Sequence, residues 1–146
     1  MITRRVALST SLGLVAAGVA STAFAADPCA KYYGKGYCTD YVNTKISPKQ
    51  SGDASRWPSN ISSSEVRAGD VAIFRSINHV AYVDSVATKD SKGRALTLNI
   101  SEWNYGSTAK KTALEKSCIV TDKFGIKTTR KIAVSAAVYM RPGKKK

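Results

Sequence analysis

The chain has 146 residues, a formal net charge of +13 at pH 7 and 43% hydrophobic residues. This length predicts a single domain, and a charge of this size constrains the partners of the protein rather than its fold. The sequence contains no internal repeat, low-complexity segment or second long hydrophobic span, which argues against a repeat array and against a membrane protein with several spans.

The first 25 residues have the pattern of a secretory signal peptide. A basic head at residues 3–5 precedes an apolar run at residues 6–20, and Ala-Phe-Ala at residues 23–25 has the small-x-small pattern of a cleavage site. The alternative is a retained anchor, but the apolar run is too short to span a bilayer permanently. We therefore expect residues 1–25 to be removed, by the general or the twin-arginine export route, and residues 26–146 to be periplasmic or secreted.

The charge of the mature chain indicates an anionic partner. Cleavage removes two arginines and no acidic residue, which leaves a net charge of +11. An exported protein does not meet intracellular nucleic acid, so the available polyanions are the wall, its acidic polymers and phospholipid headgroups. We expect an anionic wall or membrane surface as partner and no nucleic acid. The basic tail at residues 143–146 either extends this character or only aids solubility.

Hydrophobic periodicity changes from helical to strand-like along the mature chain. A short helix is predicted at residues 37–46, and the Ser-Pro pair that follows ends it. Residues 53–61 are predicted to form a loop or a short helical turn. Strands are predicted at residues 70–74, 79–86, 95–101 and 131–140. One helix followed by consecutive antiparallel strands indicates an α+β fold. The pattern assigns no element to most of residues 105–129.

Cys38 is a candidate nucleophile because of its position in a chain with an odd number of cysteines. Three cysteines are an odd number, so one is left over in an oxidising compartment, where the other two can pair. Cys38 stands at the expected start of the helix, where N–H groups and the helix dipole stabilise a thiolate. Its own N–H would face a developing oxyanion. A structural cysteine, or a disulfide between Cys29 and Cys38, is the alternative.

His79 is the only histidine, so any mechanism that needs an imidazole base must use it. It opens a predicted strand after a short turn, where its side chain can face a cleft. The alternative is a hydrogen-bonded histidine with no chemical role. One histidine and three scattered cysteines lack the paired spacing of zinc sites, so neither a metal nor a cofactor is expected.

Glu102 and Asn104 lie at the end of the third predicted strand. Because residues two apart on a strand share a face, the two side chains would point the same way. A carboxylate or amide beside His79 would fix its tautomer and stabilise the imidazolium. Without other evidence, an acid and an amide at a strand end are ordinary surface residues.

Several segments together resemble the CHAP family, the cysteine, histidine-dependent amidohydrolases/peptidases of the papain-like superfamily of bacterial wall hydrolases. The resemblance covers about residues 32–142. Its blocks, in order, are GYCTDYV at 36–42, ASRW at 54–57, GDVAIF at 69–74, HVAYV at 79–83, ISEWN at 100–104 and VYMRP at 138–142. Any one block is a weak signal, but the ordered set is specific.

The resemblance implies a papain-like α+β fold in which the N-terminal helix carries the nucleophile and packs on an antiparallel sheet. It assigns Cys38 as nucleophile, His79 as general base and Glu102 as the residue that orients the imidazole. Asn104 matches an amide that steadies the histidine or helps to bind the oxyanion. The family usually has glycine before the histidine, where this chain has Asn78, which tolerates the same left-handed backbone.

If Cys38 is the nucleophile, the resemblance leaves Cys29 and Cys118 as the pair available for a disulfide. The sequence is then expected to encode an exported cysteine amidase or endopeptidase that cleaves amide bonds in peptidoglycan. Three alternatives remain: a toxin of the same chemistry with an immunity or inhibitor protein as partner, an acyltransferase, and an inactive basic wall-binding protein.

Overall fold

The computed structural model describes residues 27–106 and 118–144, so the predicted signal peptide lies outside the described residues. One α-helix, α1 (Cys38–Asn43), precedes the strands β1 (Val71–Phe74), β2 (His79–Lys89), β3 (Ala95–Trp103), β4 (Lys127–Ala133) and β5 (Val138–Met140). Short 3-10 helices connect them, including η2 (Ala54–Arg56), η4 (Arg75–Ile77) and η5 (Val134–Ala136). None of the helices in the described ranges has the length and hydropathy needed to cross a membrane.

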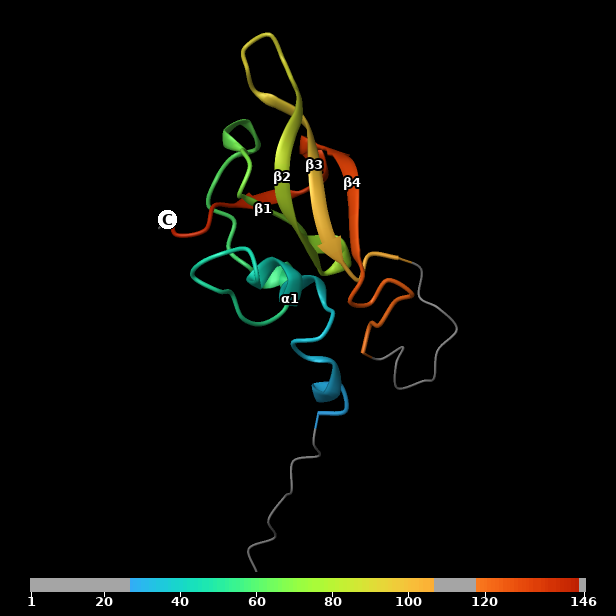
Figure 1. Ribbon diagram of the computed structural model, residues 1–146. Helices are drawn as coiled ribbons and strands as arrows, with labels where there is room; N and C mark the ends of the chain where they lie inside the picture. Colours follow the sequence, from blue (N-terminus) through green and yellow to red (C-terminus); the bar gives the residue numbers. More distant parts are fainter. Residues whose placement is uncertain (1–26, 107–117, 145–146) are drawn as a thin grey trace, which may run out of the picture.

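The five strands form one antiparallel sheet in the order β4-β3-β2-β1-β5. The hairpin of β2 and β3 forms the centre and extends past the other strands at the top of the view in Figure 1. An antiparallel sheet with one α-helix among the described residues is a small α+β fold, as the sequence pattern predicted.

The central strands are buried on both faces, which explains their continuous apolar runs. In β1, Val71 and Ile73 belong to the core cluster that includes α1, whereas Ala72 and Phe74 belong to the cluster on the opposite face. The side chains of successive strand residues point to opposite faces. The pattern VAIF therefore supplies both cores from four residues.

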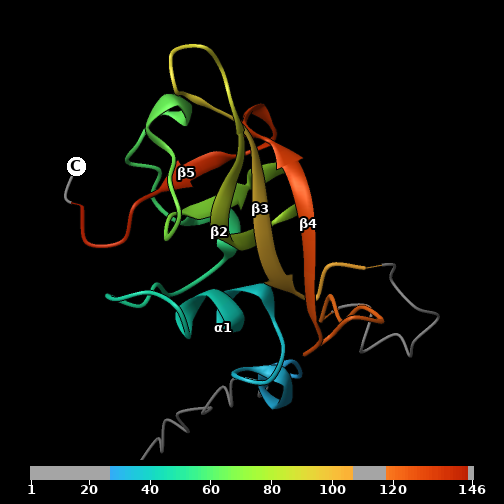
Figure 2. The same ribbon diagram turned by 45° about the horizontal axis from the view of Figure 1, so that its top comes forward.

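Helix α1 lies across the end of the sheet where β2 begins and β3 ends (Figures 1 and 2). Two contacts of Tyr41 fix it there. Its hydroxyl donates a hydrogen bond to Ser101 Oγ at 2.7 Å, and its ring lies 5.4 Å from the ring of Trp103, centroid to centroid. The helix is thereby placed beside the two strand ends that carry His79 and Glu102.

Helix α1 is shorter than the predicted segment 37–46. It ends at Asn43, whose side chain donates to the carbonyl of Gln50 at 2.8 Å and accepts from the backbone N–H of Gln50 at 2.9 Å. The next residue, Thr44, donates its hydroxyl to the carbonyl of Tyr41 at 2.7 Å and so caps the last turn. These local side-chain bonds compete with continuation of the helix.

The prediction of a single closing strand at 131–140 was wrong. The segment contains the end of β4, the turn η5 and then β5, and these two strands pair with β3 and β1 at opposite edges of the sheet. The hydroxyl of Tyr139 donates to the carbonyl of Val134 at 2.8 Å and holds the turn. No glycine or proline marks this turn, so periodicity alone did not reveal it.

Candidate active site

Cys38 is the first residue of α1, and its thiol is free and buried. The loop before it is held by Asp40, whose Oδ2 accepts hydrogen bonds from the backbone N–H groups of Tyr37 at 3.0 Å and Gly36 at 3.2 Å. A side chain at Gly36 would meet the backbone of Gly125 at 2.6 Å. Glycine is therefore required there because two chain segments pass in close contact.

His79 is positioned by the turn that precedes it. Asn78 has left-handed backbone, with φ 49° and ψ 51°, as expected for a residue standing where glycine is common. Its side-chain oxygen also accepts a hydrogen bond from the backbone N–H of Ser55 at 2.9 Å. A glycine could not make this bond, which joins the turn before His79 to η2.

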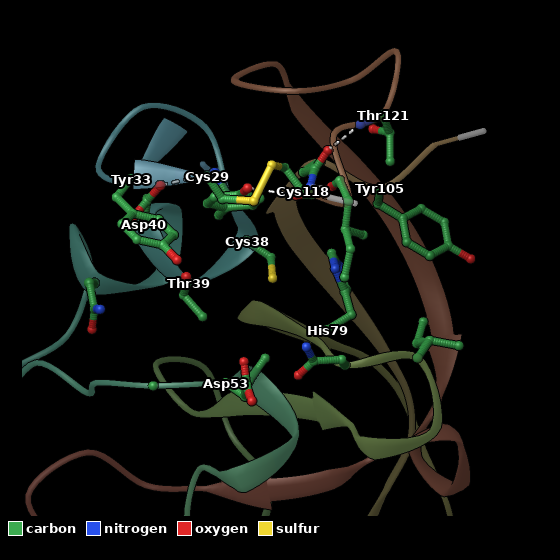
Figure 3. Close-up of a pocket in the computed structure, with 18 of the residues that line it drawn as sticks. Cys29, Tyr33, Cys38, Thr39, Asp40, Asp53, His79, Tyr105, Cys118 and Thr121 are labelled. Carbon is green, nitrogen blue, oxygen red and sulfur yellow. Dashed lines mark hydrogen bonds between the residues drawn. A yellow bond between two sulfur atoms is a disulfide. The ribbon is translucent and has the colours of Figure 1, made fainter. Parts of the chain in front are cut away.

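The imidazole of His79 bonds to a buried carboxylate. Its Nε2 lies 2.8 Å from Oε2 of Glu102, and Glu102 is fully buried. The side chain of Cys38 hydrogen-bonds the same imidazole. Figure 3 shows Cys38 and His79 on either side of one pocket.

The protonation of this pair follows from its contacts. Burial lowers the pKa of His79, but hydrogen bonds to the side chains of Cys38 and Glu102 outweigh burial and raise the pKa of the imidazole to about 9. Burial raises the pKa of Glu102, yet hydrogen bonds from His79 and Arg130 outweigh it and hold that pKa below its ordinary value. At neutral pH the imidazole is protonated and the carboxylate is charged.

Arg130 is a residue of this site that sequence reasoning missed. Its Nε donates to Oε1 of Glu102 at 2.7 Å, and its Nη2 lies 3.4 Å from Oε2. In the sequence it stands between other basic residues near the end of a very basic chain. The signal that could have found it is its position on β4, two residues from the partner of Glu102.

Asn104 lines the pocket but is not part of the pair formed by His79 and Glu102. Strand β3 ends at Trp103 and Asn104 has φ 59°, so the alternation that would align it with Glu102 does not extend to it. Its amide donates to the carbonyl of Ile119 at 2.8 Å and accepts from the N–H of Thr121 at 2.9 Å. Asn104 thus holds the segment 118–121.

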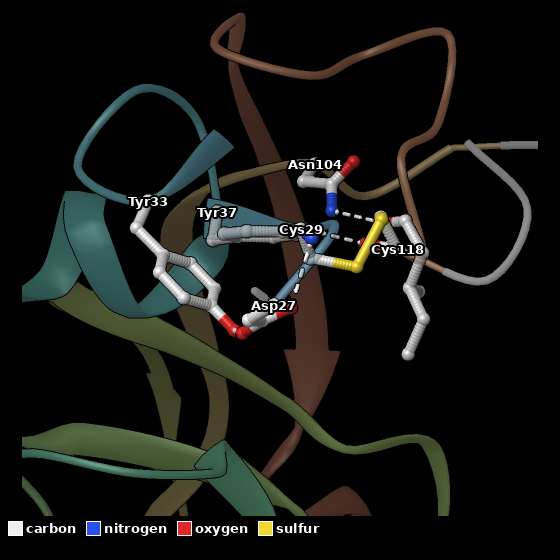
Figure 4. Close-up of a disulfide and its surroundings, with 7 residues drawn as sticks. Asp27, Cys29, Tyr33, Tyr37, Asn104 and Cys118 are labelled. Carbon is white, nitrogen blue, oxygen red and sulfur yellow. Dashed lines mark hydrogen bonds between the residues drawn. A yellow bond between two sulfur atoms is a disulfide. The ribbon is translucent and has the colours of Figure 1, made fainter. Parts of the chain in front are cut away.

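A disulfide between Cys29 and Cys118 ties the same segment to the start of the described chain (Figure 4). These are the two cysteines that the family resemblance left for a bond. The hydroxyl of Tyr37 donates to the carbonyl of Cys118 at 2.5 Å. The disulfide, Tyr37 and Asn104 together make residues 118–121 a fixed wall of the pocket.

The pocket is an open cleft of about 1140 Å³ that contains Cys38 and His79 (Figure 3). Its rim includes four large side chains that are exposed to solvent: Tyr33, Ile77, Tyr105 and Ile119. Among the described residues, the acidic and basic side chains that line the cleft are Asp40, Asp53 and His79. Although the chain has a net charge of +13, no lysine or arginine of the described residues lines this cleft.

The chain matches the family model of the CHAP domain over residues 29–104, just over half of its length. It belongs to the CHAP family. No curated protein and no solved structure gives a significant match. A CHAP domain is generally a cysteine amidase or peptidase domain, and the family acts on peptidoglycan. The matched range of this CHAP domain includes Cys38, His79 and Glu102, whereas Arg130 and the wall at 118–121 lie beyond it.

Among the described residues, no group of three or more histidine, cysteine, aspartate or glutamate side chains is arranged to hold a metal ion. The site offers a sulfur, an imidazole and a carboxylate for chemistry. These three groups are aligned from α1 through the start of β2 to the end of β3.

Proposed function

We propose that the protein is an exported cysteine amidase or endopeptidase that cleaves amide bonds in peptidoglycan, with Cys38 as nucleophile and His79 as acid and base. The observation that carries the proposal is a free thiol and an imidazole that line one cleft, with a buried carboxylate bonded to the imidazole. A nucleophile, a base and a group that orients the base are the parts that covalent hydrolysis needs.

The reaction follows from the protonation of the pair. The thiolate of Cys38 attacks the carbonyl carbon of the amide, and the C–S bond forms while the carbonyl oxygen becomes an oxyanion. When the tetrahedral intermediate collapses, the C–N bond breaks and the imidazolium of His79 gives its proton to the leaving amine. A pKa of about 9 keeps this proton on His79 at neutral pH.

Water completes the cycle. The neutral imidazole takes a proton from water, which attacks the thioester and releases the acid, and Cys38 leaves as thiolate. The N–H of Cys38 is proposed to bind the oxyanion. Asn104 can assist, because its amide carries two hydrogens and its bond to the carbonyl of Ile119 uses one.

The domain and its location are part of the same proposal. Residues 26–146 form the papain-like catalytic domain after removal of residues 1–25, and the mature protein is periplasmic or secreted. The disulfide between Cys29 and Cys118 supports an oxidising compartment, where such bonds persist. The net charge would hold the enzyme on an anionic wall.

The test is release of labelled fragments from purified peptidoglycan sacculi by the wild-type enzyme and by Cys38→Ala, with the disulfide intact in both. We expect release by the wild type, none by the variant, and loss of wild-type activity after alkylation of the free thiol. Equal release by both proteins would refute the assignment. Binding to sacculi without any release, by wild type and variant alike, would instead support the inactive wall-binding alternative.

A further inference from the structure

Arg130 reaches the site from the outermost strand. Glu102 of β3 pairs with Thr128 of β4, and Ile100 pairs with Arg130, so Arg130 is the diagonal neighbour of Glu102 on the same face of the sheet. From there its guanidinium contacts both carboxylate oxygens of Glu102, at 2.7 Å and 3.4 Å. The carboxylate thus lies between two cationic side chains, Arg130 on one side and His79 on the other.

Two aromatic rings enclose this arrangement. The guanidinium carbon of Arg130 lies 3.9 Å from the ring centroid of Tyr105 and 5.0 Å from that of Phe74. The same two rings contact the imidazole of His79, at centroid distances of 5.3 Å and 5.9 Å. Planar cations are favoured against aromatic faces. The rings therefore restrict both partners of Glu102 at once.

We propose that Arg130 is a positioning residue of the CHAP site, which holds the carboxylate of Glu102 charged and in the rotamer that orients His79. This inference rests on the proposed function, because it concerns how the proposed acid and base is held. A structural interpretation, in which Arg130 only joins β4 to β3, makes a different prediction for the titration of the site.

The physical reason lies in the burial of Glu102, which is 0% exposed. A buried carboxylate must be paired with charge or hydrogen bonds, or it takes up a proton. His79 contacts Oε2, whereas Oε1 receives the Nε–H of Arg130. The planar guanidinium of Arg130 contacts both carboxylate oxygens in a fork-like arrangement, which stops the carboxylate from rotating. A single bond to His79 cannot do this.

The charged and titratable groups around Glu102 come from three elements of the described chain. His79 from β2 and Arg130 from β4 contact the carboxylate. Cys38 from α1 hydrogen-bonds the imidazole of His79. The phenol of Tyr105 lies against His79 and Arg130, while β1 contributes the apolar Phe74. Arg130 is the permanent cation of this set, so its removal acts first on Glu102.

The experiment compares the full mature chain with Arg130→Met, which removes the charge, and Arg130→Lys, which keeps the charge but cannot form the fork. Lys131→Met is the matched control, because it removes an exposed cation from the next position of the same strand. His79 is the only histidine, so the NMR signals of its ring report the titration of the site without overlap. The kcat and KM for soluble peptidoglycan fragments are measured in parallel.

In Arg130→Met, the acid inflection of the His79 signals, which reports protonation of Glu102, is expected to rise by about one to three pH units. The kcat is expected to fall by about 100-fold with little change in KM, because a misplaced base affects the reaction more than binding. Arg130→Lys should keep an acid inflection near that of the wild type and lose part of kcat. Lys131→Met should match the wild type in both measurements.

An unchanged acid inflection in folded Arg130→Met would overturn the proposal. If that variant does not fold, Arg130→Lys decides: a wild-type kcat would show that the fork is not needed, and a reduced kcat at unchanged KM would support it. The NMR titration needs no activity. A wild type that cleaves nothing would therefore sink the proposed function while the role of Arg130 toward His79 is still measured.

Discussion

The disulfide between Cys29 and Cys118 should supply a large share of the stability of the domain. The two cysteines are 89 residues apart, so the bond closes a long loop in the unfolded chain. The loss of chain entropy for a loop of this length corresponds to about 4–5 kcal/mol at 25 °C. Since small domains have total stabilities of about 5–15 kcal/mol, this contribution separates a stable domain from a marginal one.

The perturbation is the double variant Cys29→Ala and Cys118→Ala, unfolded in urea and followed by tryptophan fluorescence. We expect the midpoint to fall by about 2–3 M, given the slope typical of small domains. A reductant should lower the midpoint of the wild type by a similar amount and leave that of the double variant unchanged. Cys38→Ser removes the thiol that is not bonded and serves as the matched control, with no comparable loss.

The site should survive this change at low temperature, because Tyr37 and Asn104 hold the segment 118–121 through hydrogen bonds of their own. Folded double variant is therefore expected to keep most of its activity on sacculi. A change in unfolding free energy below about 1 kcal/mol would refute the loop-closure argument, because the predicted effect is several times larger.

Three further changes test the site. Glu102→Gln should lower the pKa of His79 from about 9, so the alkaline limb of the pH–rate profile moves to lower pH. In the wild type, the raised pKa of His79 contributes to the free energy of unfolding. This contribution is fully present below pH 6.5 and is lost as the pH rises through about 9. Asn78→Gly keeps the left-handed turn but loses the bond to Ser55, and urea unfolding should show a loss of about 1 kcal/mol; an unchanged midpoint would argue against a role for that bond. Raising the salt concentration from about 0.05 M to about 0.5 M should reduce release of fragments from sacculi, because screening weakens the attraction of the enzyme to an anionic wall. Cleavage of a neutral soluble peptide should change little, since no lysine or arginine of the described chain lines the cleft. Equal salt dependence for both substrates would contradict this explanation.

The sequence predicted the central part of the fold because local patterns determine it. The apolar run of β1 and the alternation in β3 each identify a strand without tertiary information. The break between β4 and β5 has no such signal, because Val134–Ala136 turns without glycine or proline. There the pairing with different partner strands, which is a long-range property, decides where one strand ends and the next begins.

The candidate site likewise contains residues that the sequence alone identifies and residues that only long-range strand pairing reveals. Cys38 stands out because it lies at the start of a predicted helix, and His79 because it is the only histidine. Arg130 is one of 23 basic residues, so composition gives no reason to select it. It becomes recognisable only through the register of β3 and β4, which brings it to Glu102. Strand alternation predicted that Asn104 shares a face with Glu102. The prediction does not hold because Asn104 has left-handed backbone, so the alternation of the strand does not extend to it.

The order of the strands has a consequence for the growing chain. β4 and β5 are neighbours in sequence but cover opposite edges of the sheet. A chain that stops before residue 127 would carry the sulfur, the imidazole and the carboxylate, yet both sides of its three-stranded sheet would present unpaired N–H and C=O groups to other chains. Such fragments are expected to self-associate, so both edges of the sheet are protected against aggregation only after residues 127–140 have been added.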